Sequence, residues 1–386
     1  MAGPKEEIAV RHAEVFGAGG GVRVYRAPGR VNLIGEHTDY NLGFVLPIAL
    51  DLACFTAIAP NGEGKLRVHS IGQSETREWE VAELGALAPS RHWSDYPAGV
   101  AQQLLKAGYR VKPQNVLIHS SVPIGSGLSS SAALEVSTAL ALLGDQKIGR
   151  LELAKLCRRA ENEFVGMPCG IMDQYISVFG EDHAGVKIDC RSLDHEMVPL
   201  PENMEIVAVN TMVKHELGQS AYRERVAECR SVVEALRRSH PQVASLRDAD
   251  EEMIKSLIAV VAATPRKRAR HVVSENARVE EFVRASRAGD LSRMGELFEA
   301  SHRSIQHDYE VSCEELDFLV DAALTLPGVW GSRMTGGGFG GCTVNLVHPD
   351  AVMEFRRRLA EAYQQRFGLT PEFYSCRPSS GAGEIH

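Results

Sequence analysis

The 386-residue sequence contains no run of about 18 apolar residues, the length that a helix needs to cross a membrane. Its first thirty residues carry charges where a signal peptide would need an uninterrupted apolar core. Hydrophobic residues account for 44% of the chain and charged residues for 24%, which is the composition of an ordinary globular protein. We therefore expect a soluble, cytoplasmic protein.

Paired cysteines and an excess of basic charge are also missing. The eight cysteines include no CxxC pair and no nearby histidine at zinc spacing, so we expect free thiols. A net charge of −8 argues against a nucleic-acid surface, which needs concentrated Lys and Arg. We interpret the one basic cluster, Arg266 to Arg270, as a solvated helical face rather than a binding patch. No nucleic-acid, membrane or obligatory protein partner is indicated.

The chain has no internal repeat, low-complexity tract or Pro/Ser-rich linker, so domain boundaries are weakly marked. β-Branched runs between residues 22 and 71 predict strands and hairpins. Apolar residues at three and four spacing predict helices over 129–143 and 151–164, and long helical stretches follow over 222–323. Strand-like segments separate and follow these helices without strict strand–helix alternation. We therefore predict an α+β fold rather than a doubly wound parallel sheet.

A glycine- and serine-rich segment, "PIGSGLSSSAALEVSTALALL", runs from Pro123 to Leu143. Gly125 and Gly127 permit close backbone approach, and a predicted helix begins directly after the serines. A helix start presents unpaired N–H groups and a partial positive charge to an anion, which favours a phosphate-binding loop. The alternative is a glycine turn followed by an ordinary serine N-cap.

Two other nucleotide-binding motifs are excluded. The only Gly-Lys pair, Gly64–Lys65, is followed by Leu66, so the chain has no Walker A loop. The segment Thr335–Val347, "TGGGFGGCTVNLV", contains a literal G-x-G-x-x-G, but a predicted strand follows where the dinucleotide fingerprint requires a helix. So many glycines still indicate a backbone that folds tightly or lies against another segment.

A third segment, "RAPGRVNLIGEHTDYN" from Arg26 to Asn41, concentrates polar side chains, with Gly29 and Gly35 as bends. Carboxylates and imidazole exchange hydrogen bonds with hydroxyl groups, so this pattern favours a polyhydroxylated ligand over the alternative of a salt-bridged surface loop. The polar residues are Arg30, Asn32, Glu36, His37, Asp39 and Tyr40.

Asp173 stands in "GMPCGIMDQYISVFG", after residues that break the preceding helix and before an apolar stretch. Its local sequence alone favours a plain acid at a helix N-terminus.

Together these segments resemble the GHMP kinases, and within them the galactokinase family. "GRVNLIGEHTDY" is similar to the sugar signature, "GLSSSAALE" to the ATP-binding motif, "GIMDQ" to the catalytic-acid segment and "TGGGFGGCTV" to the third family motif, all in the family's order. The resemblance implies a two-domain fold with mixed sheets and helices and the active site between the domains. Residues 1–200 would carry the phosphate loop and sugar signature, and residues 201–386 would close the sugar site.

The resemblance further implies ATP-dependent phosphorylation of galactose at its anomeric C1 hydroxyl, assisted by Mg²⁺. It places Asp173 beside that hydroxyl and Arg30 next to Asp173. A base within reach activates a poor nucleophile, and Arg30 offsets charge on the transferring phosphoryl group. Because phosphoryl-transfer transition states are largely loose, positioning and electrostatics matter more than proton removal.

The remaining site residues also follow from the resemblance. The implied sugar contacts are Glu36, His37, Asp39, Tyr222 and the backbone of Gly170. The implied ATP contacts are Gly125, Ser126, Gly127, Leu128, Ser129, Ser130 and Ser131, with Trp93 either beside the adenine or in the core. The implied Mg²⁺ ligands are Ser131 and Glu161, whose oxygens suit this metal.

Two departures from the family pattern concern loop shape rather than catalytic groups: Ser126 stands where glycine is commoner, and Leu42 where a small or polar residue is usual. The nearest enzymatic alternative is an N-acetylgalactosamine kinase or another sugar-1-kinase, such as an arabinokinase; "EHTDYN" favours the galactokinase version. A non-catalytic galactose and ATP sensor is disfavoured because such sensors lack the Ser-Ala pair found here at Ser131 and Ala132.

Overall fold

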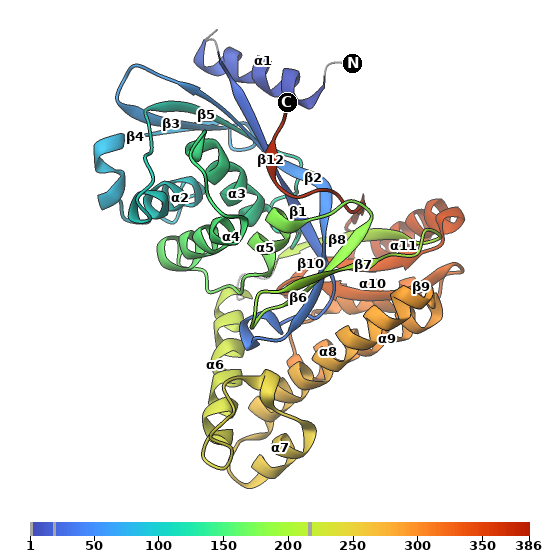
Figure 1. Cartoon of the computed structure of the whole chain (residues 1–386). Coiled ribbons are helices and arrows are strands. Elements are labelled where there is room, and N and C mark those ends of the chain that lie inside the picture. The colour runs from blue at the N-terminus through green and yellow to red at the C-terminus, as the bar shows by residue number, and fades with distance from the viewer. Residues whose placement is uncertain (1–2, 18–20, 215–217) are drawn as a thin grey trace.

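The computed structural model describes residues 3–17, 21–214 and 218–386, which form two β-sheets with helices packed against each (Figure 1). The larger, eight-stranded sheet contains β1 (Arg23–Ile34), β2 (Phe44–Pro60), β3 (Lys65–Ser70), β4 (Glu75–Glu80), β5 (Gln114–Ser120), β6 (Ala184–Asp189), β7 (His195–Pro199) and β12 (Gly383–Glu384). The smaller, four-stranded sheet contains β8 (Glu205–Lys214), β9 (Val329–Thr335), β10 (Gly340–Val347) and β11 (Glu372–Ser375). The α+β class expected from the sequence is confirmed.

The strand order of the larger sheet is β12-β1-β2-β5-β3-β4, with β6 paired to β2 and β7 to β6. In the smaller sheet the order is β11-β8-β10-β9. Pairing is antiparallel except between β3 and β5. The last strand, β12, comes from the C-terminal end of the chain and pairs with β1 at Tyr25 and Arg26. The larger sheet is therefore built from both ends of the sequence.

Five helices accompany the larger sheet in the described chain: α1 (Pro4–Phe16), α2 (Asp95–Lys106), α3 (Ser130–Leu143), α4 (Arg150–Arg159) and α5 (Met172–Phe179). Helix α3 packs on β1 and β2, and α2, α4 and α5 pack against α3. The hydrophobic pattern over 129–143 predicted α3 closely.

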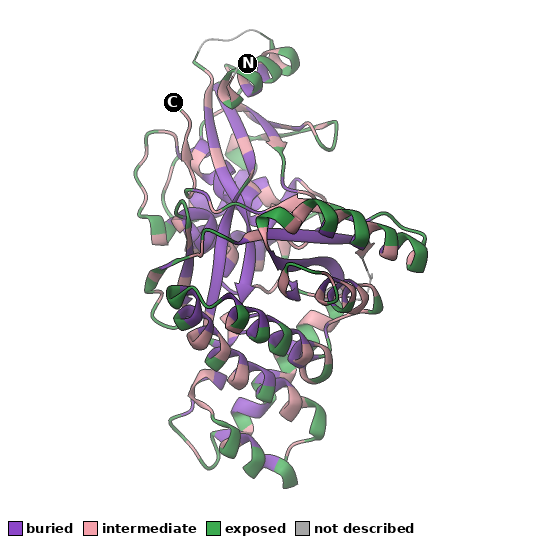
Figure 2. Cartoon of the chain, turned by 90° about the vertical axis from the view of Figure 1, so that its right-hand side faces the viewer, coloured by how far each residue is buried: buried purple, intermediate pink, exposed green. Residues whose placement is uncertain are grey.

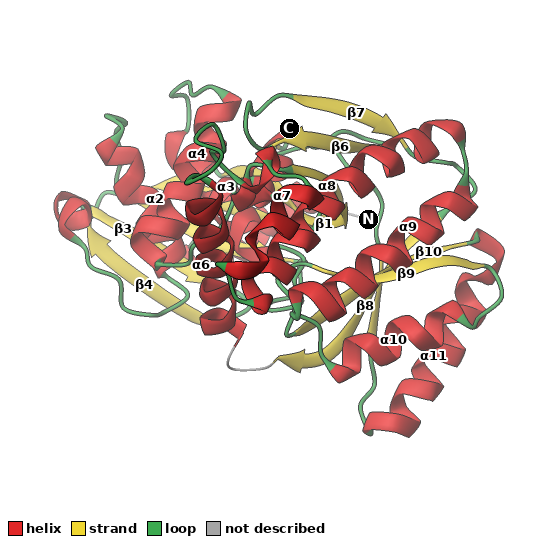
Figure 3. Ribbon diagram, turned by 90° about the horizontal axis from the view of Figure 1, so that it is seen from below, coloured by secondary structure: helices red, strands yellow, loops and turns green. Residues whose placement is uncertain are grey.

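The later part of the chain supplies α6 (Gly218–Leu236), α7 (Glu251–Ser256), α8 (Ala263–Ala288), α9 (Leu291–Ser304), α10 (Glu314–Leu324) and α11 (Val352–Phe367). Viewed from below, α9 and α10 lie along β9 and β10, with α11 beside α10 (Figure 3). Helices α6, α7 and α8 share a separate apolar cluster at the lower end of the molecule. None of the helices that the structure describes is long and apolar enough to cross a membrane.

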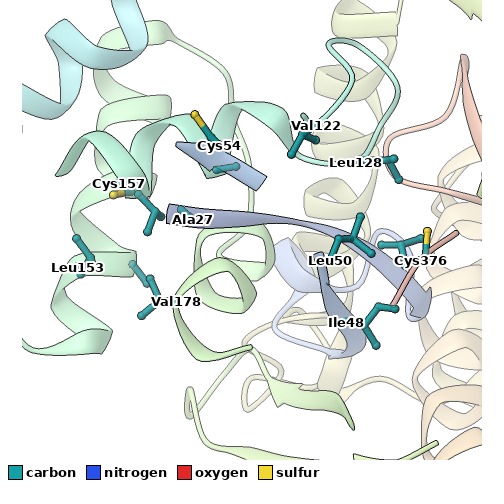
Figure 4. Packing of buried hydrophobic residues seen from close by; sticks show 14 of the residues in the cluster. Ala27, Ile48, Leu50, Cys54, Val122, Leu128, Leu153, Cys157, Val178 and Cys376 are labelled. Atoms are coloured by element: carbon teal, nitrogen blue, oxygen red, sulfur yellow. The ribbon is translucent and has the colours of Figure 1, made fainter. Parts of the chain in front are cut away.

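Strand β2 forms the centre of the main core. Its sequence is nearly continuously apolar, as expected for a strand covered on both faces, and residues 45–50 are all buried (Figure 2). Ile48, Leu50 and Cys54 belong to one cluster with Leu128, which lies just before α3 (Figure 4). Full burial of a Leu or Ile side chain contributes about 1.5–3 kcal/mol. This cluster fixes β1 and the start of α3, both of which enter the site described below.

The basic cluster at residues 266–270 is less exposed than the sequence-based interpretation expected. The cluster lies on helix α8, as expected, but Arg268 is only 2% exposed. The Arg268 guanidinium donates to Glu228 Oε2 at 2.9 Å and to Glu310 Oε2 at 2.8 Å. A buried guanidinium requires such partners, and these acids stand about 40 residues away on either side. The expectation of a wholly solvated face was therefore wrong for Arg268.

Candidate active site

A cavity of about 730 Å³ brings the predicted segments together. It is lined by Arg30 from β1, Asp173 from α5 and Tyr222 from α6. The loop before α3 contributes Gly125, Gly127 and Ser129, the start of α3 contributes Ser130 and Ser131, and the loop between β9 and β10 contributes Gly337, Gly338 and Phe339. The segments singled out in the sequence therefore do meet at one site.

The two glycine-rich loops lie directly against each other. Gly127 has a positive φ of 80° and Gly336 one of 86°, a backbone region that favours glycine. A Cβ atom on Gly336 would lie 3.1 Å from the carbonyl oxygen of Gly127, and one on Gly341 would lie 3.1 Å from that of Ser126. The glycines of the third motif are thus explained by close backbone approach rather than by a dinucleotide fold.

Ser129 occupies the N-cap position of α3, but its hydroxyl caps none of the described backbone N–H groups. The Ser129 Oγ instead donates a 2.5 Å hydrogen bond to Asp173 Oδ2. The alternative of an ordinary serine N-cap is therefore wrong. The Ser129 side chain therefore leaves the described N–H groups of the helix start uncapped and instead orients the Asp173 carboxylate.

Asp173 lies in the first turn of α5, as its local sequence indicated, but its carboxylate is engaged by side chains. Arg30 Nε donates to Oδ1 at 3.0 Å and Arg30 Nη2 to Oδ2 at 3.1 Å. Arg30 Nη1 also donates to the carbonyl oxygen of Gly127. A two-point guanidinium–carboxylate pair fixes both groups in orientation. The carboxylate remains 26% exposed, so it is accessible from the cavity.

Glu161 and Glu135 form a buried acidic pair behind the serine loop. Gln174 Nε2 donates to Glu161 Oε2 at 2.6 Å and to Glu135 Oε2 at 2.9 Å, and Ser131 also bonds to Glu161. Burial and the charge of Asp173 raise the pKa of Glu161, and burial and the charge of Glu161 raise the pKa of Glu135. A cation placed here would relieve this repulsion.

The described residues contain no group of three or more His, Cys, Asp or Glu able to hold a metal alone. Ser131 and Glu161 nevertheless fit a Mg²⁺ ion that takes its other ligands from phosphate oxygens and water. This fit rests on the adjacent hydroxyl and carboxylate lining the cavity and on the lack of compensating charge around Glu161.

The predicted sugar contacts separate into two groups. Tyr222 lines the 730 Å³ cavity, whereas Glu36 and His37 lie behind it and are 1% and 4% exposed. Glu36 Oε1 accepts hydrogen bonds from Thr335 Oγ1 at 3.0 Å and from the Gly336 N–H at 2.9 Å. Glu36 therefore holds the third glycine motif in place.

Burial shifts the pKa values of His37 and Asp39 away from their ordinary values. His37 Nδ1 is hydrogen-bonded to the Tyr40 hydroxyl at 2.8 Å, and burial followed by His271 lowers the pKa of His37 to about 3. His37 is therefore neutral at physiological pH. Burial, followed by the charge of Asp173, raises the pKa of Asp39 to about 6. A Cβ atom on Gly170 would lie 1.7 Å from Asp39 Oδ2, so only glycine fits opposite this carboxylate.

The end of the cavity beside Trp93 contains the predicted ATP-contact residues only in part. Trp93 lines it together with Tyr96, Ile118 and Leu134, and the Trp93 Nε1 donates to Glu75 Oε2 at 3.1 Å. Ser126 and Leu128 do not line the cavity and are buried; the Ser126 hydroxyl donates to the Pro123 carbonyl at 2.9 Å.

The sequence analysis missed Tyr96, Gln174 and Glu135. Glu135 stands four residues after Ser131 on α3, on the same helical face, and this spacing was the available signal.

Known proteins resemble the chain in sequence and in structure. A family model described as the galactokinase galactose-binding signature matches residues 10–60, and models for the N-terminal and C-terminal domains of GHMP kinases match residues 95–181 and 282–365. Galactokinase from Roseiflexus sp. (strain RS-1) is 44% identical over 94% of this chain and 93% of its own. Galactokinase from Thermotoga maritima is 43% identical over 93% of this chain and 99% of its own.

Among solved structures, Lactococcus lactis galactokinase complexed with galactose has a TM-score of 0.93 at 36% identity and covers 98% of this chain and 99% of that one. Methanococcus jannaschii mevalonate kinase shares the fold, with a TM-score of 0.69 at 17% identity over 94% of this chain and 100% of that one.

The raised pKa of Asp39 predicts a pH-dependent stability difference. Asp39 is protonated in the folded chain up to about pH 6 but has an ordinary pKa of 3.8 when unfolded, so the wild type loses stability as pH rises through this window. Asp39→Asn lacks this loss. Its free energy of unfolding relative to wild type should rise by about 1–3 kcal/mol between pH 4.5 and 7.5, measured by urea denaturation. The exposed control Asp350→Asn should show no such trend, and a flat difference for Asp39→Asn would contradict the assignment.

Proposed function

The chain belongs to the galactokinase family, and on this basis we propose that it transfers the γ-phosphate of ATP to the anomeric C1 hydroxyl of galactose, giving galactose 1-phosphate and ADP. The observation that carries this proposal is the two-point pair between Arg30 and Asp173 in a cavity bounded by two glycine loops. Such a pair offers an oriented acceptor for a hydroxyl proton beside a positive charge for the phosphoryl group.

In the proposed reaction, Asp173 accepts a hydrogen bond from the C1 hydroxyl and takes its proton as the C1 oxygen bonds to the γ-phosphorus. The bond between the γ-phosphorus and the β,γ-bridging oxygen breaks, and that oxygen leaves with ADP. Arg30 and Ser129 hold the carboxylate from both sides, and the three groups are fixed before substrate arrives. Fixed charges of this kind are favoured in a loose transition state, where positioning contributes most of the rate.

We propose that residues 125–131 cradle the phosphates at the start of α3, with Trp93 and Tyr96 near the adenine. Ser131 and Glu161 would hold Mg²⁺, which would neutralise phosphate charge in the reaction. Glu135 and Gln174 would keep Glu161 in position.

The proposed sugar contacts are Asp39, Tyr222 and the backbone of Gly170, with Glu36 and His37 behind them. His37 Nε2 is buried and has no hydrogen-bond partner among the described residues, so it is available for a sugar hydroxyl. Glu36 serves mainly through the third glycine motif that it holds.

We also propose two domains, residues 1–200 and 201–386, with a cytoplasmic location and no obligatory protein partner. All eight cysteines are free thiols, which suits a reducing compartment.

Substrate choice tests the reaction. With Mg²⁺ and ATP, galactose should be turned over with a far higher kcat/KM than its 4-epimer glucose. A buried polar group that bonds one hydroxyl orientation is left unpaired by the other, at a cost of about 1–3 kcal/mol per group. An ADP-release assay with galactose, glucose, N-acetylgalactosamine and arabinose measures this. Equal kcat/KM for galactose and glucose, or a preference for N-acetylgalactosamine, would exclude the proposed substrate.

The role of Asp173 is tested by Asp173→Asn. Loss of the proton acceptor and of the charge beside Arg30 should lower kcat by about 10²–10⁴, with a smaller change in galactose affinity. A plain helix-start acid would instead cost about 0.3–1 kcal/mol of stability with kcat nearly unchanged. We would measure kcat, galactose affinity and melting temperature, with the exposed Asp182→Asn as control. Near-wild-type kcat in folded Asp173→Asn would remove this residue from the mechanism.

The metal site is tested by Ser131→Ala. Because the variant removes a ligand, the Mg²⁺ concentration for half-maximal activity should rise several-fold while galactose binding stays intact. Ser130→Ala is the matched control, since Ser130 lies in the same loop without a described bond to Glu161. Activity should also vanish with chelator and return with Mg²⁺. If Ser131→Ala kept the wild-type Mg²⁺ dependence, the ligand assignment would be wrong.

A further inference from the structure

A second cavity, of about 840 Å³, has an unexplained concentration of positive charge. It is formed by α4, α6, the segment 166–171 and the turn after β6, and it shares no lining residue with the 730 Å³ cavity. Its basic side chains are Lys155, Arg158, Arg159, Arg191, Arg223 and Arg230. The acidic side chains that line it are Asp39 and Glu163.

Part of this charge has no ion-pair partner among the residues that the structure describes. Arg159 pairs with Glu152 at 2.8 Å and Arg191 with Asp248 at 2.6 Å, both on the rim. Lys155, Arg158 and Arg230 form no ion pair with any residue in the described ranges. Ordinary surface cations alternate with acids, whereas these converge on one hollow from two helices. A hollow lined in this way favours an anionic ligand.

Neither substrate of the proposed reaction accounts for the charge. Galactose is neutral and needs no cluster of cations. The phosphates of ATP are assigned to the serine loop and to Arg30, which line the other cavity. The second cavity adjoins the proposed sugar contacts Asp39 and Gly170, and its cations have the chemistry of an anion site that neither substrate fills.

Two of the cations are already oriented by the chain. Arg158 Nε donates to the Cys169 carbonyl at 3.2 Å, and Arg223 Nη2 donates to the Gly166 carbonyl at 2.8 Å. The Nη groups of Arg158 make no bond to a described residue, so they remain available to a ligand. Guanidinium forks of this kind match phosphate oxygens in pairs.

We propose that this cavity binds a small phosphate monoester of about the size of a hexose phosphate, the chemical class of the reaction's own product. In that respect the inference rests on the proposed function. Phosphate oxygens pair with Arg158, Lys155 and Arg230, while the apolar side chains of Leu193 and Val226 contact the remainder. The ligand also abuts Asp39 and Gly170, which links its occupancy to the sugar site.

The test is a calorimetric titration of galactose 1-phosphate into the full chain saturated with galactose, Mg²⁺ and the β,γ-imido analogue of ATP. With the reaction site filled, we expect one remaining site whose affinity falls as NaCl is raised. The double variant Lys155→Gln/Arg230→Gln should weaken this binding about ten-fold, because it removes two charged contacts. Turnover of the double variant without added phosphate ester should match wild type.

Matched controls separate this site from general charge effects. Arg284→Gln removes an exposed cation of α8 that does not line this cavity, and this variant should bind galactose 1-phosphate as wild type does. Lys155→Arg/Arg230→Lys should restore affinity to within about three-fold, because the charges are kept. Melting temperature establishes that each variant is folded.

Four outcomes would overturn the proposal: no binding to the saturated chain, affinity unchanged in the double variant, inorganic phosphate bound as tightly as galactose 1-phosphate, or lost basal turnover in the folded double variant. The wild type could also fail to phosphorylate galactose and yet bind galactose 1-phosphate more tightly than the double variant does. That result would exclude the proposed reaction but not the second site.

Discussion

The ion pair between Arg30 and Asp173 holds together the three segments that make the site. Arg30 belongs to strand β1, Asp173 to α5, and the same guanidinium bonds to Gly127 in the loop before α3. The backbone N–H of Arg30 also donates to the Leu128 carbonyl at 3.0 Å. One residue on a rigid strand thereby sets the distance between the acid and the phosphate loop. A site built in this way needs little reorganisation when substrates bind.

The buried side chain of Glu36 holds the third glycine motif, residues 335–347, in place in a similar way. Glu36 accepts from Thr335 and Gly336, while Arg333 contacts it at 3.4 Å. The N-terminal sugar signature is therefore bonded to the strand β9 of the smaller sheet. Removing one partner of such a buried network leaves the other groups unsatisfied, which costs far more than the bonds alone contribute. We infer that Glu36 contributes to the arrangement of the two sheets as well as to the sugar site.

Much of this architecture could be predicted from the sequence because its signals are local. Helix α3 and the glycine loops follow from periodicity and from backbone freedom over a few residues. The role of Asp173 could not be derived in the same way, since its partners Arg30 and Ser129 lie 143 and 44 residues away. The burial of Arg268 was missed for the same reason, because Glu228 and Glu310 approach it only in the folded chain. The family resemblance supplied what local chemistry left open at Asp173. The resemblance did not predict the cations of the second cavity, because they come from separate parts of the sequence and meet only in the folded chain.

The pairing of β12 with β1 also affects how the chain folds. Arg23 forms a two-point ion pair with Glu384, so the edge of the larger sheet joins segments that are 361 residues apart. Contacts of such separation form late in folding because of the entropy of the intervening loop. Until then β1 has an unpaired edge, which is a surface for aggregation. Closing this edge therefore depends on a contact between segments far apart in the chain, and Tyr25 and Arg26 of β1 stay unpaired on that side until Gly383 and Glu384 reach them.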